Sequence, residues 1–93
     1  MWTIETTRTF RKDVKRERRG PLGKKVDRLL FEFVDLLVAD AKLPERCRDH
    51  AMIGEWADFR DCHIRPDLVL IYRKLNNDVL QLVRLGSHSE LGI

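Results

Sequence analysis

Five polar side chains in the second half of the chain are of types that carry out acid–base chemistry on a phosphodiester. They are His50, His63, Asp67, Arg84 and His88. Histidine titrates near neutral pH and can accept or donate a proton, and an aspartate can carry a proton or orient a histidine. Arginine stays charged and matches phosphate oxygens with a bidentate fork. Together these types supply what RNA cleavage without a metal requires: a base for the 2′-hydroxyl, an acid for the leaving 5′-oxygen and a cation for the phosphate.

Each of these residues also has a structural interpretation. The alternatives are a surface position for His50, a core histidine at His63, ordinary turn chemistry at Asp67, an ion-pair partner at Arg84 and a fraying terminus at His88. A zinc site built from the three histidines is a second functional alternative. Their spacing, at positions 50, 63 and 88, matches no compact ligand pattern. We therefore expect no metal and no cofactor.

Hairpin geometry predicts that the polar residues converge. If residues 76 and 77 form a two-residue loop, the numbers of paired residues sum to 153. Val69 then lies opposite Arg84, with Asp67 and His88 farther along the same two strands. Paired residues share a face, as do residues two apart, so Asp67, Arg84 and His88 emerge on one face at one end of the sheet. The turn at 65–67 returns His63 to that end. A slip of one residue would break this arrangement.

Hydrophobic patterning predicts the elements that position these residues. Residues 2–6 alternate as a short strand, and a charged helix runs from a cap at Thr7 or Thr9 to about Arg19. A second helix, ending near Asp40, has a buried face of Val26, Leu29, Leu30, Phe33, Val34, Leu37 and Val38. Residues 56–64, 68–72 and 79–85 follow as an antiparallel meander. We therefore predict one α+β domain over 1–93, with an N-terminal strand and two helices packed on an antiparallel sheet.

Charge is unevenly distributed along the chain. The net charge is +3, but residues 8–28 hold ten Lys/Arg and three acidic residues, a local balance of +7. This layout indicates a surface that faces a polyanion, although a solvated helix face would explain it as well. We assign RNA or ribosome contacts to Lys12, Lys15, Arg16, Arg19 and Arg60.

Cellular location is predicted from what the sequence contains at its ends and in its apolar runs. No run is long enough to cross a bilayer, and residues 1–5 do not resemble the start of a signal peptide. We expect a cytoplasmic protein with no membrane partner. Cys47 and Cys62 lack CxxC spacing, and in a reducing compartment we expect two free, buried or half-buried thiols.

Short motifs distributed over the whole chain resemble those of the YafQ branch of the RelE toxin superfamily. They are LP at 43–44, DH at 49–50, GEW at 54–56, RDCHI at 60–64, PD at 66–67, LIY at 70–72, RLGSH at 84–88 and the leucine at 91. The resemblance implies the RelE-like toxin fold and a ribosome-dependent endoribonuclease that cleaves mRNA. The expected products are a 2′,3′-cyclic phosphate and a 5′-hydroxyl. The implied partners are mRNA, the ribosome and a cognate antitoxin.

The resemblance also assigns roles to the five polar residues. Asp67 and His88 are the expected acid–base pair and Arg84 the phosphate-binding cation, while His50 and His63 position the RNA or share proton transfer. Two positions depart from the family: Leu68 stands where tryptophan is usual, and no aromatic follows Leu91. Lost base stacking, worth ~1–3 kcal/mol, would alter affinity or codon preference and leave the proton chemistry intact. A toxin of this fold directed at a protein target and a module that binds without cleaving remain as alternatives.

Overall fold

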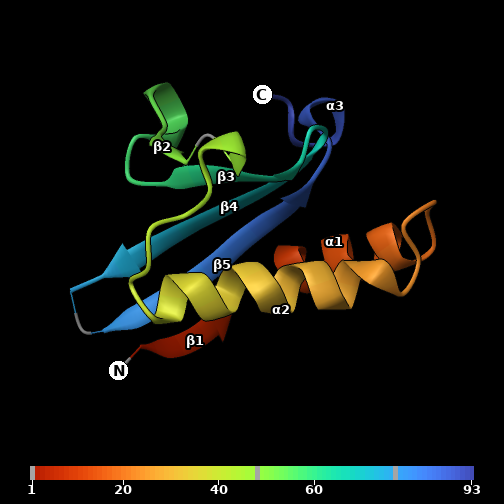
Figure 1. The fold of residues 1–93 in the computed structure, drawn as a ribbon. Coiled ribbons are helices and arrows are strands. Elements are labelled where there is room, and N and C mark those ends of the chain that lie inside the picture. Colours follow the sequence, from red (N-terminus) through yellow and green to blue (C-terminus); the bar gives the residue numbers. More distant parts are fainter. Residues whose placement is uncertain (1, 48, 77) are drawn as a thin grey trace.

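Two long helices lie side by side across one face of a mixed sheet (Figure 1). The computed structural model describes residues 2–47, 49–76 and 78–93. Within this part of the chain the sheet has five strands in the order β1-β5-β4-β3-β2. The strands are β1 (Thr3–Thr6), β2 (His50–Ala51), β3 (Arg60–Arg65), β4 (Leu68–Leu75) and β5 (Val79–Gly86). The helices are α1 (Arg8–Arg18), α2 (Lys25–Val38) and α3 (His88–Leu91), with short 3-10 helices η1 (Glu45–Cys47) and η2 (Gly54–Trp56).

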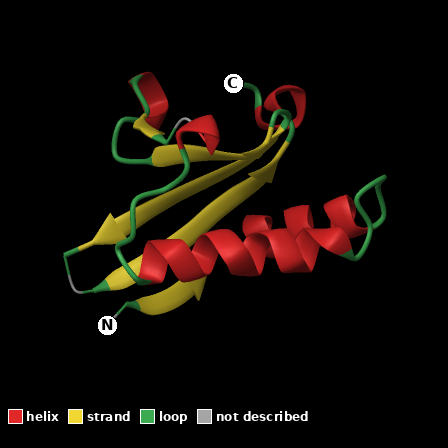
Figure 2. Cartoon of the chain, viewed as in Figure 1, coloured by secondary structure: helices red, strands yellow, loops and turns green. Residues whose placement is uncertain are grey.

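The two long helices form for the reasons that the sequence predicts. The Thr7 hydroxyl accepts a hydrogen bond from the Phe10 backbone N–H at 3.0 Å, which caps the start of α1. In α2, Val26, Phe33 and Leu37 are buried. The remaining apolar residues of its predicted face are partly buried against the same core. Figure 2 shows both helices on one side of the sheet, so that the two apolar stripes cover that face.

Each face of the sheet contributes to a separate hydrophobic cluster. The larger cluster lies under the helices and includes Cys62, Leu70, Tyr72, Leu80 and Leu85. The smaller cluster joins Val69 and Ile71 to Leu91 of α3, with Met52, Trp56, Phe59 and Val83 packed against it. The second face is therefore only partly covered, by α3 and by the segment around η2. Both cysteines are buried, as predicted, and no disulfide joins them.

The register of the β4–β5 hairpin differs from the prediction. Leu75 pairs with Val79, because residues 76–78 connect the strands and Asp78 adopts a left-handed φ of 59°. A bulge between Tyr72↔Leu82 and Ile71↔Arg84 adds a second shift of one residue. The two shifts add to a displacement of two residues, so the backbone of Arg84 keeps its place on the side of Val69 and Ile71, although the predicted partners are wrong. Val69 lies opposite Gly86 and not Arg84.

Three other elements depart from the expected meander. The strand predicted from residue 56 begins at Arg60, because η2 and a turn precede it. β1 joins the sheet as an edge strand parallel to β5, so the sheet is mixed and not wholly antiparallel. The C-terminal residues form α3, which begins with a capping box between Ser87 and Glu90. This short helix fixes the position of His88 at its first turn.

Candidate active site

The ends of β3, β4 and β5 bring three of the predicted residues into direct contact. His63 lies opposite Val69 in the ladder, on the face of the smaller cluster. Asp67 lies in the turn between β3 and β4, and His88 follows β5. The Nε2 atoms of His63 and His88 are 3.0 Å apart, and Nδ1 of His88 is 2.8 Å from Asp67 Oδ1. The predicted convergence of His63, Asp67 and His88 is therefore present in the fold.

A continuous chain of polar contacts runs through both imidazole rings. His63 Nδ1 lies 3.1 Å from the Cys47 carbonyl oxygen, which can only accept. Asp67 Oδ1 also accepts the backbone N–H of His88 at 3.0 Å. Because a carbonyl and a carboxylate oxygen are acceptors, each Nδ1 carries the hydrogen of its contact. The nitrogens that remain available for proton transfer are then the two Nε2 atoms, which face each other.

With both Nδ1 atoms donating, the facing Nε2 atoms form a hydrogen bond only when one of them carries a proton. Two neutral imidazoles with hydrogen on Nδ1 would place two lone pairs against each other at 3.0 Å. One proton between the Nε2 atoms converts this contact into an N–H···N hydrogen bond and gives the pair a single positive charge. The pair then holds one nitrogen that can donate a proton and one that can accept a proton, which is what a two-proton reaction needs.

Asp67 is ionised in this arrangement. The hydrogen bond from the His88 backbone N–H, followed by that from the His88 ring, lowers the pKa of Asp67 below its ordinary value. A carboxylate held in this way is a poor proton donor near neutral pH. Its geometry suits it to hold the ring of His88 in one tautomer and one orientation.

Arg84 contacts helix α1 and not the histidines. Its Nε and Nη2 donate to the Asp13 carboxylate at 2.8 and 3.3 Å, and Asp13 is buried. Among the described residues, no hydrogen bond or ion pair joins Arg84 to His63, Asp67 or His88. The structural alternative for Arg84, an ion-pair partner, is therefore present, while its contact with a phosphate stays a prediction.

Asp13 and Arg16 complete the free edge of β5. The pairing of β1 with β5 ends at Thr6↔Leu82, and beyond it the Leu85 N–H donates to Asp13 at 3.0 Å. The Leu85 carbonyl accepts from Arg16 Nη2 at 2.8 Å. Burial would raise the pKa of Asp13, but hydrogen bonds from Arg84 and Leu85 and the nearby arginine charges outweigh it and lower that pKa. Side chains of α1 thus replace a neighbouring strand, a role that the sequence reasoning missed.

The predicted RNA-contact residues fall into two groups: three exposed residues at α1, and two arginines, Arg16 and Arg60, that form ion pairs within the fold. Lys12, Lys15 and Arg19 are exposed on or just after α1, and their RNA contacts stay a prediction. Arg16 differs from the expectation of a solvated side chain, because it also pairs with Glu90 at 2.8 Å. Arg60 pairs with Asp49 at 3.1 Å.

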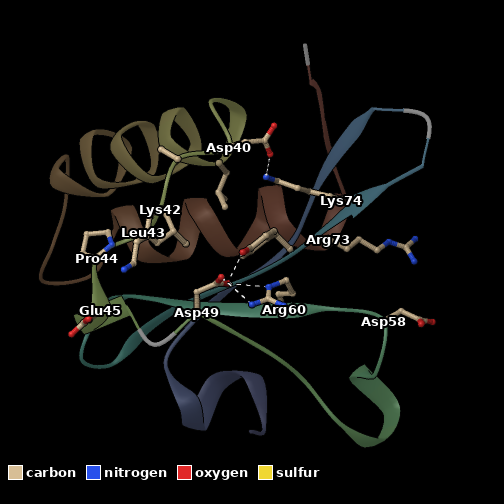
Figure 3. A pocket seen from close by; sticks show the side chains of 13 residues that line it. Asp40, Lys42, Leu43, Pro44, Glu45, Asp49, Asp58, Arg60, Arg73 and Lys74 are labelled. Atoms are coloured by element: carbon tan, nitrogen blue, oxygen red, sulfur yellow. Dashed lines mark hydrogen bonds and ion pairs between the residues drawn. The ribbon is translucent and has the colours of Figure 1, made fainter.

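Arg60 and Asp49 lie beside a cavity on the helix side of the sheet (Figure 3). The cavity is about 620 Å³ and lies between the C-terminal end of α2, the following loop and β3–β4. The Tyr72 hydroxyl donates to Asp49 at 2.5 Å, and burial together with this contact raises the pKa of Tyr72. None of the described residues that line the cavity is a histidine.

His50 is only partly defined. Its backbone pairs with Asp61 in the β2–β3 ladder, and its side chain lies outside the described part of the structure. Asp61 is a second residue that the sequence reasoning missed: its carboxylate is buried on the face that carries His63. The alternation of β3 contains the signal, since positions 61 and 63 are two residues apart and share a face.

The model of the YafQ toxin family, described as bacterial toxins of type II toxin–antitoxin systems, matches residues 2–92. The chain belongs to this family. The mRNA interferase toxin YafQ of Escherichia coli K12 is 34% identical over 88 residues, which cover 95% of this chain and 92% of that protein. A YafQ protein of Haemophilus influenzae is 48% identical over 54 residues, about half of each chain (55% and 53%).

Solved structures of toxins have the same fold. A metal-bound toxin from Helicobacter pylori is 41% identical and superposes with a TM-score of 0.84, over 98% of this chain and 99% of that one. YafQ in the E. coli DinJ–YafQ complex is 32% identical, with a TM-score of 0.78 over 98% of both chains. The expected RelE-like α+β toxin fold is therefore confirmed.

The part of the chain that the structure describes contains no metal-binding cluster and no membrane-spanning helix. No group of three or more His, Cys, Asp or Glu side chains within 2–47, 49–76 and 78–93 could hold a metal ion. No helix in these ranges is long and apolar enough to span a bilayer.

Proposed function

We propose that the toxin is an mRNA interferase, an endoribonuclease that cleaves mRNA on the ribosome by acid–base catalysis without a metal. The observation that carries this proposal is the chain of contacts from Asp67 through His88 and His63 to the Cys47 carbonyl. It is supported by the E. coli relative, an mRNA interferase toxin that aligns with 95% of this chain.

The two histidines supply the proton transfers. The 2′-oxygen attacks the adjacent phosphorus while one Nε2 takes the 2′-hydroxyl proton. The bond from phosphorus to the 5′-oxygen breaks, and the protonated Nε2 of the other ring delivers its proton to that oxygen. The products are a 2′,3′-cyclic phosphate and a 5′-hydroxyl, and the pair again holds one proton. Because the Nε2 atoms are 3.0 Å apart, the rings separate to admit the phosphate.

The remaining residues position the reacting groups. Asp67 holds His88 through Nδ1 and through its backbone N–H, so we assign Asp67 a positioning role and the acid–base pair to His63 and His88. Arg84 adds positive charge for the phosphate in the transition state, held in place by Asp13. His50 remains a candidate for positioning RNA.

The partners follow from the family and the surface charge. E. coli YafQ forms a complex with DinJ, and we propose an antitoxin as the partner that neutralises this toxin. The exposed Lys12, Lys15 and Arg19 contact ribosomal RNA, where each phosphate contact adds affinity that depends on salt. We also propose that the toxin acts in the cytoplasm, where mRNA is translated.

The proposal is tested by incubating the purified toxin with translating ribosomes and analysing the ends of the mRNA fragments. We expect fragments with a 2′,3′-cyclic phosphate and a 5′-hydroxyl. His88→Ala should lower the single-turnover rate by ~10²–10⁴-fold, the usual contribution of one positioned proton carrier. Ser89→Ala, at an exposed neighbouring position, should cleave at the parental rate. Cleavage by folded His88→Ala at the parental rate would refute the assignment, and intact mRNA with the parent toxin would refute the function.

A further inference from the structure

A row of four side chains crosses the sheet on the face that carries His63. Phe59 precedes β3, Arg73 pairs with Gln81 in β4–β5, and Gln81 pairs with Glu5 of β1. Tyr72, Leu80 and Leu82 point into the core beneath the helices, so their neighbours Arg73 and Gln81 lie on the opposite face by alternation.

Arg73 is held in a fixed orientation within this row. Its guanidinium carbon lies 4.9 Å from the centroid of the Phe59 ring, and its Nε donates to Gln81 Oε1 at 2.6 Å. Gln81 is fixed in turn by donating from Nε2 to Glu5 Oε1 at 2.9 Å. Trp56 packs edge-on against Phe59 with ring centroids 5.3 Å apart. Figure 3 shows Arg73 extending away from Asp49 and Lys74.

Hydrogen-bond donors of Arg73 and part of the ring surfaces of Phe59 and Trp56 remain accessible to a ligand. Among the described residues, no hydrogen bond or ion pair occupies the two Nη atoms of Arg73. Phe59, Trp56 and Arg73 are each partly exposed. A guanidinium fork matches phosphate oxygens, and aromatic rings and guanidinium planes stack on bases of any sequence. The fixed geometry reduces the side-chain entropy that binding would otherwise lose.

The row is continuous with the candidate active site. Arg73 follows Val69, the partner of His63, by four residues in the same strand. At ~3.3 Å per residue this places the row about 13 Å from the histidine pair along the sheet. A stacked strand rises ~3.4 Å per nucleotide, so the row lies within about four nucleotides of a phosphate at His63 and His88.

We propose that Arg73, Phe59 and Trp56 form a binding subsite for single-stranded RNA, contacting a nucleotide of the mRNA a few positions from the scissile phosphate. This inference rests on the proposed ribonuclease function and extends it from cleavage to substrate binding. Arg73 takes the phosphate or a base edge with its Nη atoms, and the two rings stack with a base.

The test compares Arg73→Gln with Lys74→Gln in the full-length toxin. The two changes remove one charge each from neighbouring residues whose charged groups point in different directions, since Lys74 pairs with Asp40 while Arg73 contacts Phe59 and Gln81. The probe is a short single-stranded RNA with a 2′-O-methyl group at the cleavage position, and binding is measured by fluorescence anisotropy against salt. Steady-state cleavage of the unmodified RNA on ribosomes gives KM and kcat separately.

We expect Arg73→Gln to weaken binding about 5- to 10-fold and to flatten the salt dependence by ~0.7 in log–log slope, the value for one phosphate contact on a single strand. The loss should appear in KM with little change in kcat. Gln81→Ala, which frees the guanidinium without removing it, should weaken binding less. Lys74→Gln should bind like the parent.

Parental affinity of folded Arg73→Gln and of folded Phe59→Leu would overturn the subsite while leaving ribonuclease activity established. A defect in neutralisation by the antitoxin, with RNA binding unchanged, would assign the row to a protein partner and equally overturn the proposal. Absence of cleavage by the parent toxin is a different outcome, because it refutes the proposed function and not the RNA contact, which the anisotropy assay measures directly.

Discussion

Replacing Asp13 with asparagine should destabilise the toxin far more than the same change at a surface aspartate. Asp13 is 2% exposed and accepts four hydrogen bonds, at 2.8–3.3 Å, from Arg16, Arg84 and the Leu85 backbone. All four contacts present donors. In asparagine an NH2 group replaces one of the two carboxylate oxygens and would face these donors. The hydrogen bonds that this oxygen accepts are therefore lost.

The magnitude follows from what is left unpaired. Breaking a buried ion pair by removing one partner costs about 3–5 kcal/mol. Arg16 and Arg84 retain side-chain exposures of 40% and 24% and regain some water, which reduces the expected loss to about 2–4 kcal/mol. A domain of this size has ~5–14 kcal/mol of unfolding free energy in total. A loss of about 3 kcal/mol corresponds to a Tm lower by roughly 12–24 °C.

The assay is urea and thermal unfolding followed by circular dichroism, with Asp27→Asn as the matched control. Asp27 pairs with Arg18 at 2.6 Å, but both side chains are about half exposed, at 54% and 49%. An exposed pair at the start of a helix contributes little to stability, because water and salt screen it. If Asp13→Asn and Asp27→Asn differ by less than about 0.5 kcal/mol, α1 does not complete the edge of β5 in the way described.

Three further predictions concern charge and metal. Cleavage should survive EDTA treatment of the toxin alone, with Mg²⁺ restored before ribosomes are added; stoichiometric zinc whose removal abolishes activity would contradict this. Burial, partly opposed by Arg16 and reinforced by Glu90, raises the pKa of Glu17. The folded state therefore favours the protonated form of Glu17. The stability that this form contributes to the folded toxin is present at acid pH and is lost as pH rises through the raised pKa. Glu17→Gln should accordingly be more stable than the parent at pH 7 and equal to it near pH 3, and a urea-unfolding series that shows the opposite trend would refute the cause. Reversing charge at Lys12, Lys15 and Arg19 together should weaken ribosome binding and flatten its salt dependence, and ribosome affinity unchanged in a folded variant would remove α1 from the docking surface.

Most elements of the fold could be predicted from hydrophobic periodicity. The buried face of α2 could be predicted residue by residue, because a stripe at helical spacing has one way to be buried. The cap at Thr7 and the strands of the hairpin were predicted for similar local reasons. β2, η2 and α3 were not predicted, since two to four residues contain too little periodicity to distinguish a short element from a loop.

The candidate site was predicted by an argument whose intermediate step was wrong. The loop of residues 76–78 and the bulge at β5 each shifted the register by one residue. Neither is visible in an apolar pattern, and only their sum kept Asp67 beside His88. A shift of two residues leaves each side chain of the strand on its predicted side of the sheet. The side depends on the alternation of side chains and not on the partner of any one residue.

The charged residues of α1 show what sequence reasoning could not separate. Asp13 and Arg16 lie among seven other charged positions between 8 and 19, and nothing in their types marks them as partners of β5. Their role follows from the end of the β1–β5 pairing at Leu82, a tertiary feature. Lys12 and Lys15, one residue before each, stay exposed.

His63 and His88 should act as one proton-carrying pair, and a double-mutant cycle measures whether their contributions to cleavage are coupled. Single-turnover cleavage of ribosome-bound mRNA is measured for His63→Ala, His88→Ala and the double variant, each verified as folded. Groups that act as a unit lose most of their effect when either is removed. We expect the double variant to cleave about as slowly as the slower single variant. Losses that multiply, with the double variant slower by the product of the two single effects, would contradict it.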